Sequence, residues 1–575
     1  MIEGLSTQRK DLLAAPGHLL VMGGPGSGKS TIALLKASAE FQAGGLSKHQ
    51  HVLFLSFARP TIARVAELAT KLIDQGSRAS LEIGTYHGFF WKLLRSHGYL
   101  IFGPGIIRIL PPPEAAVRLA DMDSREAREA EKLRLFEEEG FLHFDLFATV
   151  ATDLLVRSKR LKQVICKSYP IVIVDEFQDT NEQEWAFIRA LGDSSRLIAL
   201  ADPEQRIYEF RGADPKRIGE FTEAFKPKIF DFGTDNFRSN GRDITTFGND
   251  LLVGKVAGKT YQDVTVVRYQ FYQGLNSLFP VKASVIKRIK ELLKEPANAW
   301  SLAVLVPSKR MMLQISDYLD IKSDGLPALR HDVALDTEAP ALAAIALAGL
   351  LEGGNSASAI ADRLVEDLIQ HIRGRKGNES PPQAELKLAI ALGTFLTTGA
   401  VTGKNRRRIV DSIGTVAEKR MSLSLSGDPE ADWLAVRRLL SDSDAPEIQQ
   451  LSDDVKYLRL LHKGAVLRSR LGDLWRQGGG YRNAPAAVRD ALMQEHFSST
   501  VRDWRGIHVM TIHKAKGKEF TEVVIAEGLH QGKIVRQNAT PNEVAQARLA
   551  LRVAVTRATN HATILTPKSD PCPLL

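Results

Sequence analysis

The sequence predicts an α/β fold with two parallel-sheet cores, each carrying a largely helical insertion. Short aliphatic runs alternate with longer stretches of helical periodicity, which is the pattern of strand–helix–strand units. Several runs are apolar throughout, as strands are when both faces of a parallel sheet are covered. The expected strands form an N-terminal group, at residues 19–22, 52–56, 171–174 and 197–201, and a C-terminal group, at 302–306, 509–512, 523–526 and 562–565.

A long stretch with many helical signals and few strand signals separates the two groups. It includes a helix expected at residues 341–351, which ends at the helix stop Gly353-Gly354. A shorter insertion within the N-terminal group contains three consecutive prolines and a charge-dense helix expected at residues 121–139. We therefore expect a first core at residues 1–98 and 168–234, a first insertion at 99–167, a second core at 235–320 and 501–575, and a second insertion at 321–500.

The composition excludes several classes of protein. Of the 575 residues, 25% are charged and 44% are hydrophobic, which is the balance of a globular protein and not of a disordered chain. The longest nearly apolar run, residues 339–351, is interrupted by Pro340 and is too short to cross a bilayer. The N-terminal segment lacks the apolar core of a signal peptide, so we expect a cytoplasmic protein with no membrane partner.

Cysteine content and charge narrow the possibilities further. Cys166 and Cys572 form no paired motif, so a disulfide framework or a cysteine-ligated zinc site is not expected. The 76 Lys and Arg residues exceed the 67 Asp and Glu residues, giving a net charge of 76 − 67 = +9. A basic balance favours a polyanionic partner such as a nucleic acid but does not establish one, because many proteins are mildly basic.

A glycine-rich segment between an expected strand and an expected helix carries the strongest local signal. It follows the apolar run 19–22, and a helical pattern begins at Thr31. Glycines allow backbone N–H groups to converge on phosphate oxygens, and the N-terminus of the helix adds a positive dipole. Lys29 would neutralise the β- and γ-phosphates of a nucleotide, and the Ser30 hydroxyl would bind Mg²⁺. The segment reads Gly23-Gly24-Pro25-Gly26-Ser27-Gly28-Lys29-Ser30.

Two consecutive carboxylates follow the expected strand 171–174. Because parallel strands end at the same edge of a sheet, Asp175 and Glu176 would lie beside the glycine-rich segment. Asp175 would then bind Mg²⁺ through the coordination shell of the ion, and Glu176 would polarise an attacking water. An aliphatic run followed by Asp-Glu is common by itself, and an exposed strand end is the alternative. The glycine-rich segment upstream favours the catalytic interpretation.

An ordered series of motifs resembles superfamily 1A helicases of the UvrD/Rep/PcrA type. Residues 175–183, Asp-Glu-Phe-Gln-Asp-Thr-Asn-Glu-Gln, resemble motif II, and residues 202–213 resemble motif III. An ordered set that spans the chain is more specific than any single motif. The remaining segments are similar to motif Ia at 56–59, motif Ib at 84–89, motif IV at 235–239, motif V at 511–520 and motif VI at 555–558.

The resemblance implies a layout and a nucleotide site. It implies two RecA-like cores, called 1A and 2A, with insertions 1B and 2B, and it implies that ATP and Mg²⁺ bind in the cleft between the cores. Gln8, which precedes the glycine-rich segment, would read the adenine base, and Glu519 would contact the ribose.

The same resemblance assigns three further residues to catalysis. Gln205 would join Glu176 on the side of core 1A, and Arg238 and Arg557 would complete the site as arginine fingers. The chemical need is clear, because charge spreads over the γ-phosphate in the transition state and a guanidinium matches it. Without the motifs, a surface salt bridge would be the ordinary interpretation of either arginine.

A track for single-stranded DNA is also implied by the resemblance. Aromatic stacking combined with phosphate contacts binds single strands without sequence preference. Phe210 stands where the family usually has Trp, which keeps an aromatic face of smaller area. An aromatic residue taken alone is more often part of a core. The implied track residues are Phe57, His87, Tyr208 and Phe210, with Arg211 and His513 as weaker candidates, and His513 could equally be a hydrogen-bonding residue at a core edge.

Some features depart from the family pattern. Arg552 stands five residues before Arg557, where the family usually has an aromatic residue. Arg59-Pro60 replaces a more usual Asn-Lys pair, and insertion 1B is short, which leaves less surface for a duplex. The basic cluster 404–408 in insertion 2B could contact duplex phosphates, although a solvated loop is the simpler interpretation.

The function implied is that of an ATP hydrolase that moves 3′ to 5′ along single-stranded DNA and unwinds duplexes. Its partners would be single-stranded DNA, junctions of single- and double-stranded DNA, and a separate nuclease or repair protein. The tasks implied are DNA repair or anti-phage defence, since compact chains of this family resemble helicase subunits of Gabija-type systems. The alternative is a regulatory subunit that senses ATP and DNA and switches a partner without unwinding. RNA also stays open as a substrate, because the track has no readable feature that senses a 2′-hydroxyl.

Overall fold

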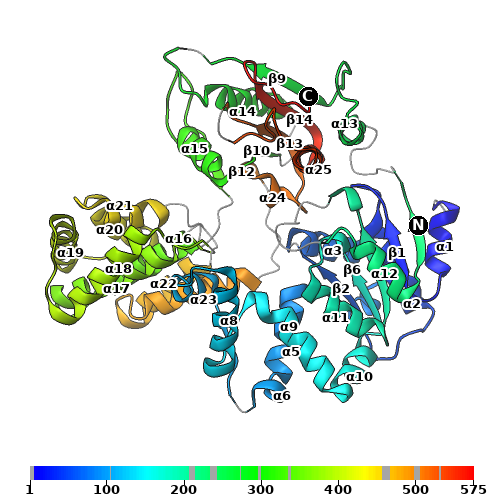
Figure 1. Cartoon of the computed structure of the whole chain (residues 1–575), viewed down its shortest axis with the longest axis horizontal. Coiled ribbons are helices and arrows are strands. Elements are labelled where there is room, and N and C mark those ends of the chain that lie inside the picture. Colours follow the sequence, from blue (N-terminus) through cyan, green and yellow to red (C-terminus); the bar gives the residue numbers. More distant parts are fainter. Residues whose placement is uncertain are drawn as a thin grey trace. The chain divides into compact units, whose positions relative to one another are not determined.

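The protein packs as two units, which are both drawn in Figure 1. The first unit spans Met1–Leu93, Ala148–Ala334 and Ser499–Leu575, and the second spans Leu94–Phe147 and Leu335–Ser498. The first unit holds two parallel sheets and the second is mostly helical, so the predicted α/β fold class is confirmed. The computed structural model describes residues 5–57, 59–103, 105–205, 214–233, 242–271, 273–294, 300–333, 338–377, 379–455, 466–497, 505–529 and 532–575. No helix in these ranges is both long enough and apolar enough to cross a membrane.

The first sheet, with its helices, is called the first core. Its strands and helices are β1 Leu19–Met22, β2 Val52–Ser56, β3 Leu81–Thr85, β6 Ile171–Val174, β7 Arg196–Ala201 and β8 Lys228–Asp231, with α1 Thr7–Ala14, α2 Lys29–Gln42, α3 Arg59–Leu72, α4 Gln75–Arg78, α5 Tyr86–His97, α9 Phe147–Arg157, α10 Lys159–Ser168, α11 Glu182–Gly192, α12 Arg217–Phe225 and the 3-10 turns η2 Phe177–Asp179 and η3 Pro203–Gln205. The strand order is β3-β2-β6-β7-β1-β8, with every pairing parallel. On one face Leu19, Val21 and Phe54 pack with residues of α1, α2 and α3.

The second sheet, with its helices, is called the second core. Its elements are β9 Val264–Tyr269, β10 Ser301–Val306, β11 His331–Val333, β12 Gly506–Thr511, β13 Phe520–Ala526 and β14 Ala558–Pro567, with α13 Ile244–Leu252, α14 Phe279–Leu292, α15 Lys309–Asp320, α24 Ile512–Ala515 and α25 Pro541–Val555. The order is β11-β12-β10-β13-β14-β9, again parallel throughout. Helix α25 begins with a capping box, in which Thr540 and Glu543 satisfy each other's backbone N–H groups. Strand β11 pairs with β12 although it lies within the range 321–500 expected for the second insertion.

The inner strands of both sheets match the aliphatic runs of the sequence. β1, β2 and β6 have the expected bounds, and β10 begins one residue early, at Ser301. The remaining inner strands are longer at their starts than expected: β7 begins one residue early, β12 and β13 three residues early and β14 four residues early, and β14 also ends two residues late. Ile512, which was expected to close β12, instead begins α24. The outermost strands, β3 and β8 in one sheet and β11 and β9 in the other, were not predicted. Each is only partly buried, so none has the continuous apolar run of a central strand.

The second unit is built largely from helices. The predicted helix at 341–351 is present as α16, whose residues from Pro340 to Leu351 are all buried. The charge-dense helix begins at Arg125, where Ser124 caps it, and not at residue 121. The elements are α6 Tyr99–Phe102, β4 Arg108–Leu110, α7 Pro112–Arg118, α8 Arg125–Glu139, β5 Phe141–His143, η1 Phe144–Leu146, α16 Glu338–Glu352, α17 Ala357–Gly374, α18 Gln383–Thr398, α19 Lys404–Ser422, α20 Pro429–Ser441, α21 Pro446–Val455, α22 Val466–Gly478 and α23 Ala484–Phe497.

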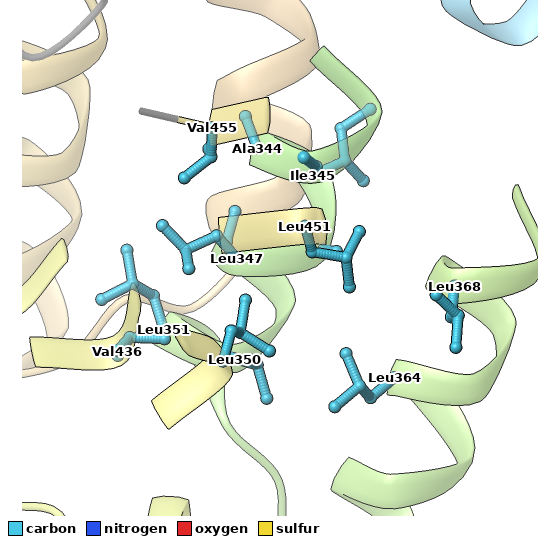
Figure 2. Packing of buried hydrophobic residues seen from close by; sticks show 14 of the residues in the cluster. Ala344, Ile345, Leu347, Leu350, Leu351, Leu364, Leu368, Val436, Leu451 and Val455 are labelled. Atoms are coloured by element: carbon cyan, nitrogen blue, oxygen red, sulfur yellow. The ribbon is translucent and has the colours of Figure 1, made fainter. Parts of the chain in front are cut away.

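Helix α16 lies at the centre of the largest hydrophobic cluster described. Figure 2 shows Leu347 and Leu351 of α16 among side chains of neighbouring helices, including Leu451 of α21 and Val436 of α20. A helix that is apolar on every side is stable in water only when it is surrounded. The aliphatic composition of α16 therefore fixes it as the core of this unit.

We predict that Leu347→Ala lowers the free energy of unfolding by about 2–5 kcal/mol, because it removes a fully buried side chain and leaves a cavity. Urea unfolding followed by tryptophan fluorescence measures the change, since Trp433 belongs to the same cluster. The control is Leu434→Ala on α20, whose leucine is 43% exposed and should cost less than about 0.5 kcal/mol. Equal losses in the two variants would contradict the packing described.

Candidate nucleotide and nucleic-acid site

Five motif segments begin at or directly after the ends of parallel strands of the first core. Gly23 follows β1, Phe57 follows β2, Tyr86 follows β3, Asp175 follows β6 and Asp202 follows β7. The strands end together, because Met22 pairs with Ala201, Ser56 pairs with Thr85, and the N–H of Asp175 donates to Leu55 O at 2.8 Å. The segments therefore meet at the carboxyl edge of the sheet, where open α/β sheets bind ligands.

The glycine-rich segment has the backbone of a phosphate-binding loop. Gly26 and Gly28 have left-handed φ angles of 79° and 85°, which favour glycine. A Cβ at Gly23 would lie 2.7 Å from Ser27 Oγ, so the chain approaches itself too closely there for any side chain. Gly28 caps α2 without a side chain, which leaves the first N–H groups of the helix available to an anion.

Two features of this loop fit a bound phosphate chain. The Ser27 hydroxyl is buried and has no hydrogen-bond partner among the described residues. Lys29 Nζ lies within the loop and donates to Gly23 O at 2.6 Å and to Gly24 O at 3.1 Å. These carbonyls hold the ammonium group where incoming phosphate oxygens would compete for it. Pro25 is buried, and Ser30 and Thr31 lie on the first turn of α2.

The two carboxylates after β6 differ in environment. Asp175 is 3% exposed and accepts a hydrogen bond from Ser56 Oγ at 3.3 Å. Burial, together with the neighbouring charge of Glu176, raises the pKa of Asp175 to about 7. Burial alone would also raise the pKa of Glu176, but the charges of Lys516 and Lys29 and a hydrogen bond from Gln178 outweigh it and lower that pKa. Glu176 is therefore ionised, as a proton acceptor must be.

Glu176 is also held in an unusual backbone conformation. Its φ of 53° and ψ of 39° are left-handed, which costs energy for a residue with a side chain and is found most often at functional sites. Gln178 Nε2 donates to Glu176 Oε2 at 2.6 Å, and its Oε1 accepts the N–H of Asp202 at 3.0 Å. Gln205 Nε2 in turn donates to Asp202 Oδ2 at 2.5 Å. The network joins the segments after β6 and β7.

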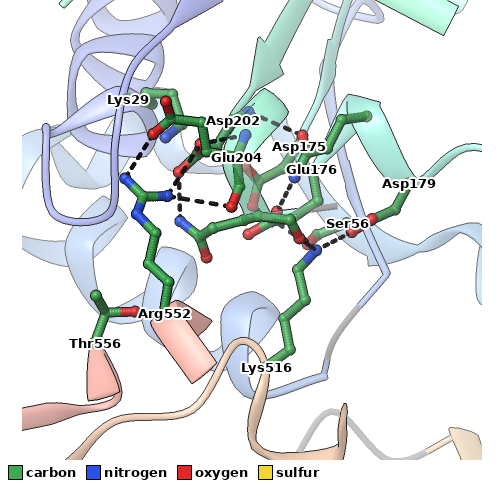
Figure 3. A network of polar contacts seen from close by, with 12 residues as sticks. Lys29, Ser56, Asp175, Glu176, Asp179, Asp202, Glu204, Lys516, Arg552 and Thr556 are labelled. Atoms are coloured by element: carbon green, nitrogen blue, oxygen red, sulfur yellow. Dashed lines mark hydrogen bonds and ion pairs between the residues drawn. The ribbon is translucent and has the colours of Figure 1, made fainter. Parts of the chain in front are cut away.

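Cations from the second core reach these carboxylates. Figure 3 shows Lys516 and Arg552 extending toward them from two different segments. Lys516, which follows α24, donates to Asp179 and to Gln205 O, at 2.5 Å for the latter, and lies 3.8 Å from Glu176 Oε2. Both Lys516 and Asp179 are nearly fully buried, so the pair links the two cores in a site with little water.

Arg557, the residue implied as an arginine finger, lies close to the first core. It is 2% exposed and follows Thr556, the C-cap of α25. Its Nη2 donates to Gln205 Oε1 at 3.2 Å, and its Nε donates to Val553 O at 2.9 Å. The structure thus brings Gln205 of the first core and Arg557 of the second together, as the resemblance implied.

Arg552 is a further cation of the second core that contacts the first core. It lies on α25 and is 2% exposed. Its Nη1 donates to Glu204 O at 3.2 Å, and its Nη2 lies 2.9 Å from Glu204 Oε2 and 3.3 Å from Asn249 Oδ1. Its Nη1 is also 3.8 Å from Asp202 Oδ1. The residue that departs from the family pattern is therefore a buried arginine that is paired with a partly exposed glutamate of the first core.

The other residues implied for the nucleotide have these positions. Gln8 lies on α1, and its Nε2 donates to Asp231 O at 2.8 Å at the end of β8. Its neighbour Arg9 donates to Ser27 O of the phosphate loop at 3.1 Å. Glu519 forms an ion pair with Arg64 on α3, which is a further contact between the cores. Arg238 lies outside the described residues.

The residues implied for the DNA track are only partly described. Phe57 is half-buried and stacks on Tyr86, with ring centroids 4.5 Å apart and an angle of 26° between the planes. His87 follows in the first turn of α5 and is half-buried. His513 lies in α24, where burial lowers its pKa and favours the neutral ring. Tyr208, Phe210 and Arg211 lie outside the described residues.

Sequence reasoning missed several residues of the site. Asp179 and Gln178 lie within the motif at 175–183, and Lys516 lies within the motif at 511–520, so each was quoted without a role. The signal available was a charged or amide residue inside a motif that ends at a sheet edge. Arg552 was noticed only as a departure, because no local pattern tells which carboxylate a distant arginine will meet.

Known proteins resemble this chain over nearly its whole length. The family model of the UvrD/REP helicase N-terminal domain matches residues 5–135 and 128–226. DNA helicase II of Escherichia coli (strain K12) is 21% identical over an alignment covering 98% of this chain and 84% of that protein. Putative ATP-dependent DNA helicase YjcD of Bacillus subtilis (strain 168) is 22% identical, covering 98% and 79% respectively.

A shorter match of higher identity is to RecBCD enzyme subunit RecB of Buchnera aphidicola subsp. Schizaphis graminum (strain Sg), 34% identical over 18% of this chain and 9% of that protein. The ordered motifs, the two parallel sheets and these similarities agree. Together they support the resemblance of this chain to UvrD/Rep-type superfamily 1 helicases.

We predict that Lys516→Met lowers the free energy of unfolding of the nucleotide-free protein by about 3–5 kcal/mol, because it leaves the buried Asp179 carboxylate without its cation. The double variant Lys516→Met/Asp179→Asn should recover much of this loss, since neither charge then stays buried alone. Denaturant unfolding measures both. Lys294→Met, at a lysine that is 70% exposed, serves as the control. A double variant as unstable as the sum of the two single variants would rule out the pairing.

Proposed function

We propose that the protein is an ATP-dependent translocase and helicase that moves along single-stranded DNA. One observation carries the proposal. A phosphate-binding loop, an ionised Glu176 beside Asp175, and cations from a second parallel-sheet core all meet at one sheet edge. A site made by two separate cores suits a motor, because binding and release of a shared ligand changes the contacts between them.

The residues of the candidate site have the following chemical roles in the proposed hydrolysis. Glu176 accepts a proton from water as the water oxygen attacks the γ-phosphorus of ATP. The bond between that phosphorus and the β–γ bridging oxygen breaks, giving ADP and inorganic phosphate. Lys29 and Arg557 stabilise the charge on the phosphate oxygens. Gln205, which is hydrogen-bonded to both Asp202 and Arg557, orients the reacting groups.

Two donors fit the Mg²⁺ that such chemistry uses. The Ser30 hydroxyl lies in the first turn of α2, and Asp175 follows β6 at the same edge of the sheet, so hydroxyl and carboxylate oxygens are both available. Bound there, Mg²⁺ would neutralise phosphate charge. The raised pKa of Asp175 reflects burial beside a like charge, and a divalent cation would favour its ionised form.

The names of the relatives support the choice of DNA over other ligands. Two of them are called DNA helicases, and their alignments cover nearly the whole chain. Movement from 3′ to 5′ and a role in DNA repair or anti-phage defence are proposed on the family resemblance. The half-buried Phe57, stacked on Tyr86 at the sheet edge, is proposed to contact bases.

A second candidate is a subunit that switches a partner without unwinding DNA. The local similarity to a protein named as a subunit of the RecBCD enzyme supports this candidate. Its partner would be a nuclease or another repair protein. The same ATP site would serve both candidates, so strand separation is the property that divides them.

We predict that single-stranded DNA stimulates ATP hydrolysis and that Glu176→Gln lowers the turnover about 10²- to 10⁴-fold, because the proton acceptor is lost. Phosphate release with and without DNA measures the effect. Lys29→Ala should weaken nucleotide binding as well, whereas Glu176→Gln should not.

The matched control is Glu67→Gln, at an exposed glutamate of α3 that should leave turnover unchanged. Turnover that ignores DNA in the unaltered protein would contradict the motor. Hydrolysis stimulated by DNA without release of a strand from a forked duplex would favour the switching subunit.

A further inference from the structure

Arg552 is a buried cation in a place where the resemblance leads one to expect an aromatic ring. It projects from α25 of the second core into the acidic edge of the first core, as Figure 3 shows. Glu204 meets it through both its backbone carbonyl and its carboxylate, and Asn249 of α13 meets it from the side of the second core. Gly248 makes room, since a Cβ there would lie 3.3 Å from Arg552 Cγ.

The guanidinium also lies against the phosphate loop. A Cβ built on Gly24 would be 3.7 Å from Arg552 Nη2, so this terminal nitrogen lies where a side chain at Gly24 would contact it. Arg552 Nε is buried and has no hydrogen-bond partner in the part of the chain that the structure describes. Arg552 therefore has one donor, Nε, without a partner among the described residues, and its Nη2 lies near the loop, whose Lys29 is already held by loop carbonyls.

The carboxylates around Arg552 would affect the binding of a nucleotide. Asp202 is 3% exposed, and Glu204 lies beside it, so two carboxylates flank the edge where a polyphosphate would lie. Without a cation they would repel the phosphates. A guanidinium can satisfy carboxylate and phosphate oxygens together, because it presents five donors in one plane. An aromatic side chain in the same place carries no positive charge and has at most one donor.

We propose that Arg552 is a further nucleotide-contacting residue, whose guanidinium binds phosphate oxygens of ATP from the second core. Glu204 is its partner in the absence of nucleotide and competes with the phosphates for it. The inference rests on the proposed ATP site. Arg552 would be a second guanidinium at the ATP site, in addition to Arg557. Different residues hold the two groups: Gln205 and Val553 hold Arg557, whereas Glu204 and Asn249 hold Arg552.

The competing explanation is that Arg552 only stabilises the contact between the two cores. The two explanations predict opposite changes in nucleotide affinity when Glu204 is removed. If Arg552 only joins the cores, removing either Arg552 or Glu204 breaks the same pair and affects nucleotide binding in the same direction. If Arg552 binds phosphate, its removal weakens binding, whereas removal of Glu204 releases the guanidinium and strengthens binding. Glu204 is 55% exposed, so its neutral variant should fold.

The experiment measures the affinity of the full chain for ATPγS by competition with a fluorescent methylanthraniloyl-ADP. Arg552→Gln should weaken ATPγS binding about tenfold or more, because a hydrogen bond to a charged group is lost. Glu204→Gln should strengthen it, by up to about fivefold. Arg552→Lys should lie between the unaltered protein and Arg552→Gln, since it keeps the charge without the planar fork.

Glu220→Gln is the matched control, because Glu220 also pairs with a buried arginine of the first core, Arg217, and should leave the affinity unchanged. Unchanged affinity in Arg552→Gln, or weaker binding in Glu204→Gln, would overturn the inference. If Arg552→Gln does not fold, the sign of Glu204→Gln decides. The proposed ATP site fails separately, if the unaltered protein and Lys29→Ala show the same negligible binding.

Discussion

Carboxylates crowded at the end of a parallel sheet need cations, and among the residues that the structure describes several of those cations come from the second core. Asp175 and Glu176 follow one strand, and Asp202 and Glu204 follow the next. Lys29 is the nearby cation of the first core, while Lys516 and Arg552 cross from the second. The contacts between the cores are thus made by the same groups that would meet a nucleotide. This is the physical reason that a ligand at this edge affects how the cores are joined.

The inner strands can be predicted from the sequence and the outer strands cannot, because the two kinds of strand differ in burial. A strand covered on both faces must be apolar at every position, as Ile171–Val174 is, and such a run is visible in a sequence. An edge strand is solvated on one side, so Lys228–Asp231 buries only Phe230 and leaves no run to detect. Strand β11 adds a second difficulty, because its three residues lie far along the chain from the strand with which they pair.

The residues of the candidate site likewise divide into those that local motifs predict and those that only the fold brings together. The phosphate loop, Asp175 and Glu176 are local motifs whose spacing on the chain sets their geometry, so they could be predicted. Gln205 and Arg557 were found because family motifs contain them, and the structure places them 3.2 Å apart. The pairs Lys516–Asp179 and Arg552–Glu204 join residues more than 300 positions apart. No pattern along the chain encodes such a pair, and only the fold shows which carboxylate each cation meets.

The central claim is that a nucleotide is a ligand shared by both cores, and the distance between them is its most direct test. Spin labels on Lys71→Cys of α3 and Lys294→Cys beside α14 would report that distance by electron–electron dipolar spectroscopy, since both lysines are exposed. Burial raises the pKa of the Cys166 thiol and raises that of Cys572 to about 12, which disfavours their labelling. The account predicts that ATPγS with Mg²⁺ shifts and narrows the distance distribution, and that Lys29→Ala abolishes the change. Identical distributions with and without the nucleotide, in a protein that binds it, would contradict the account.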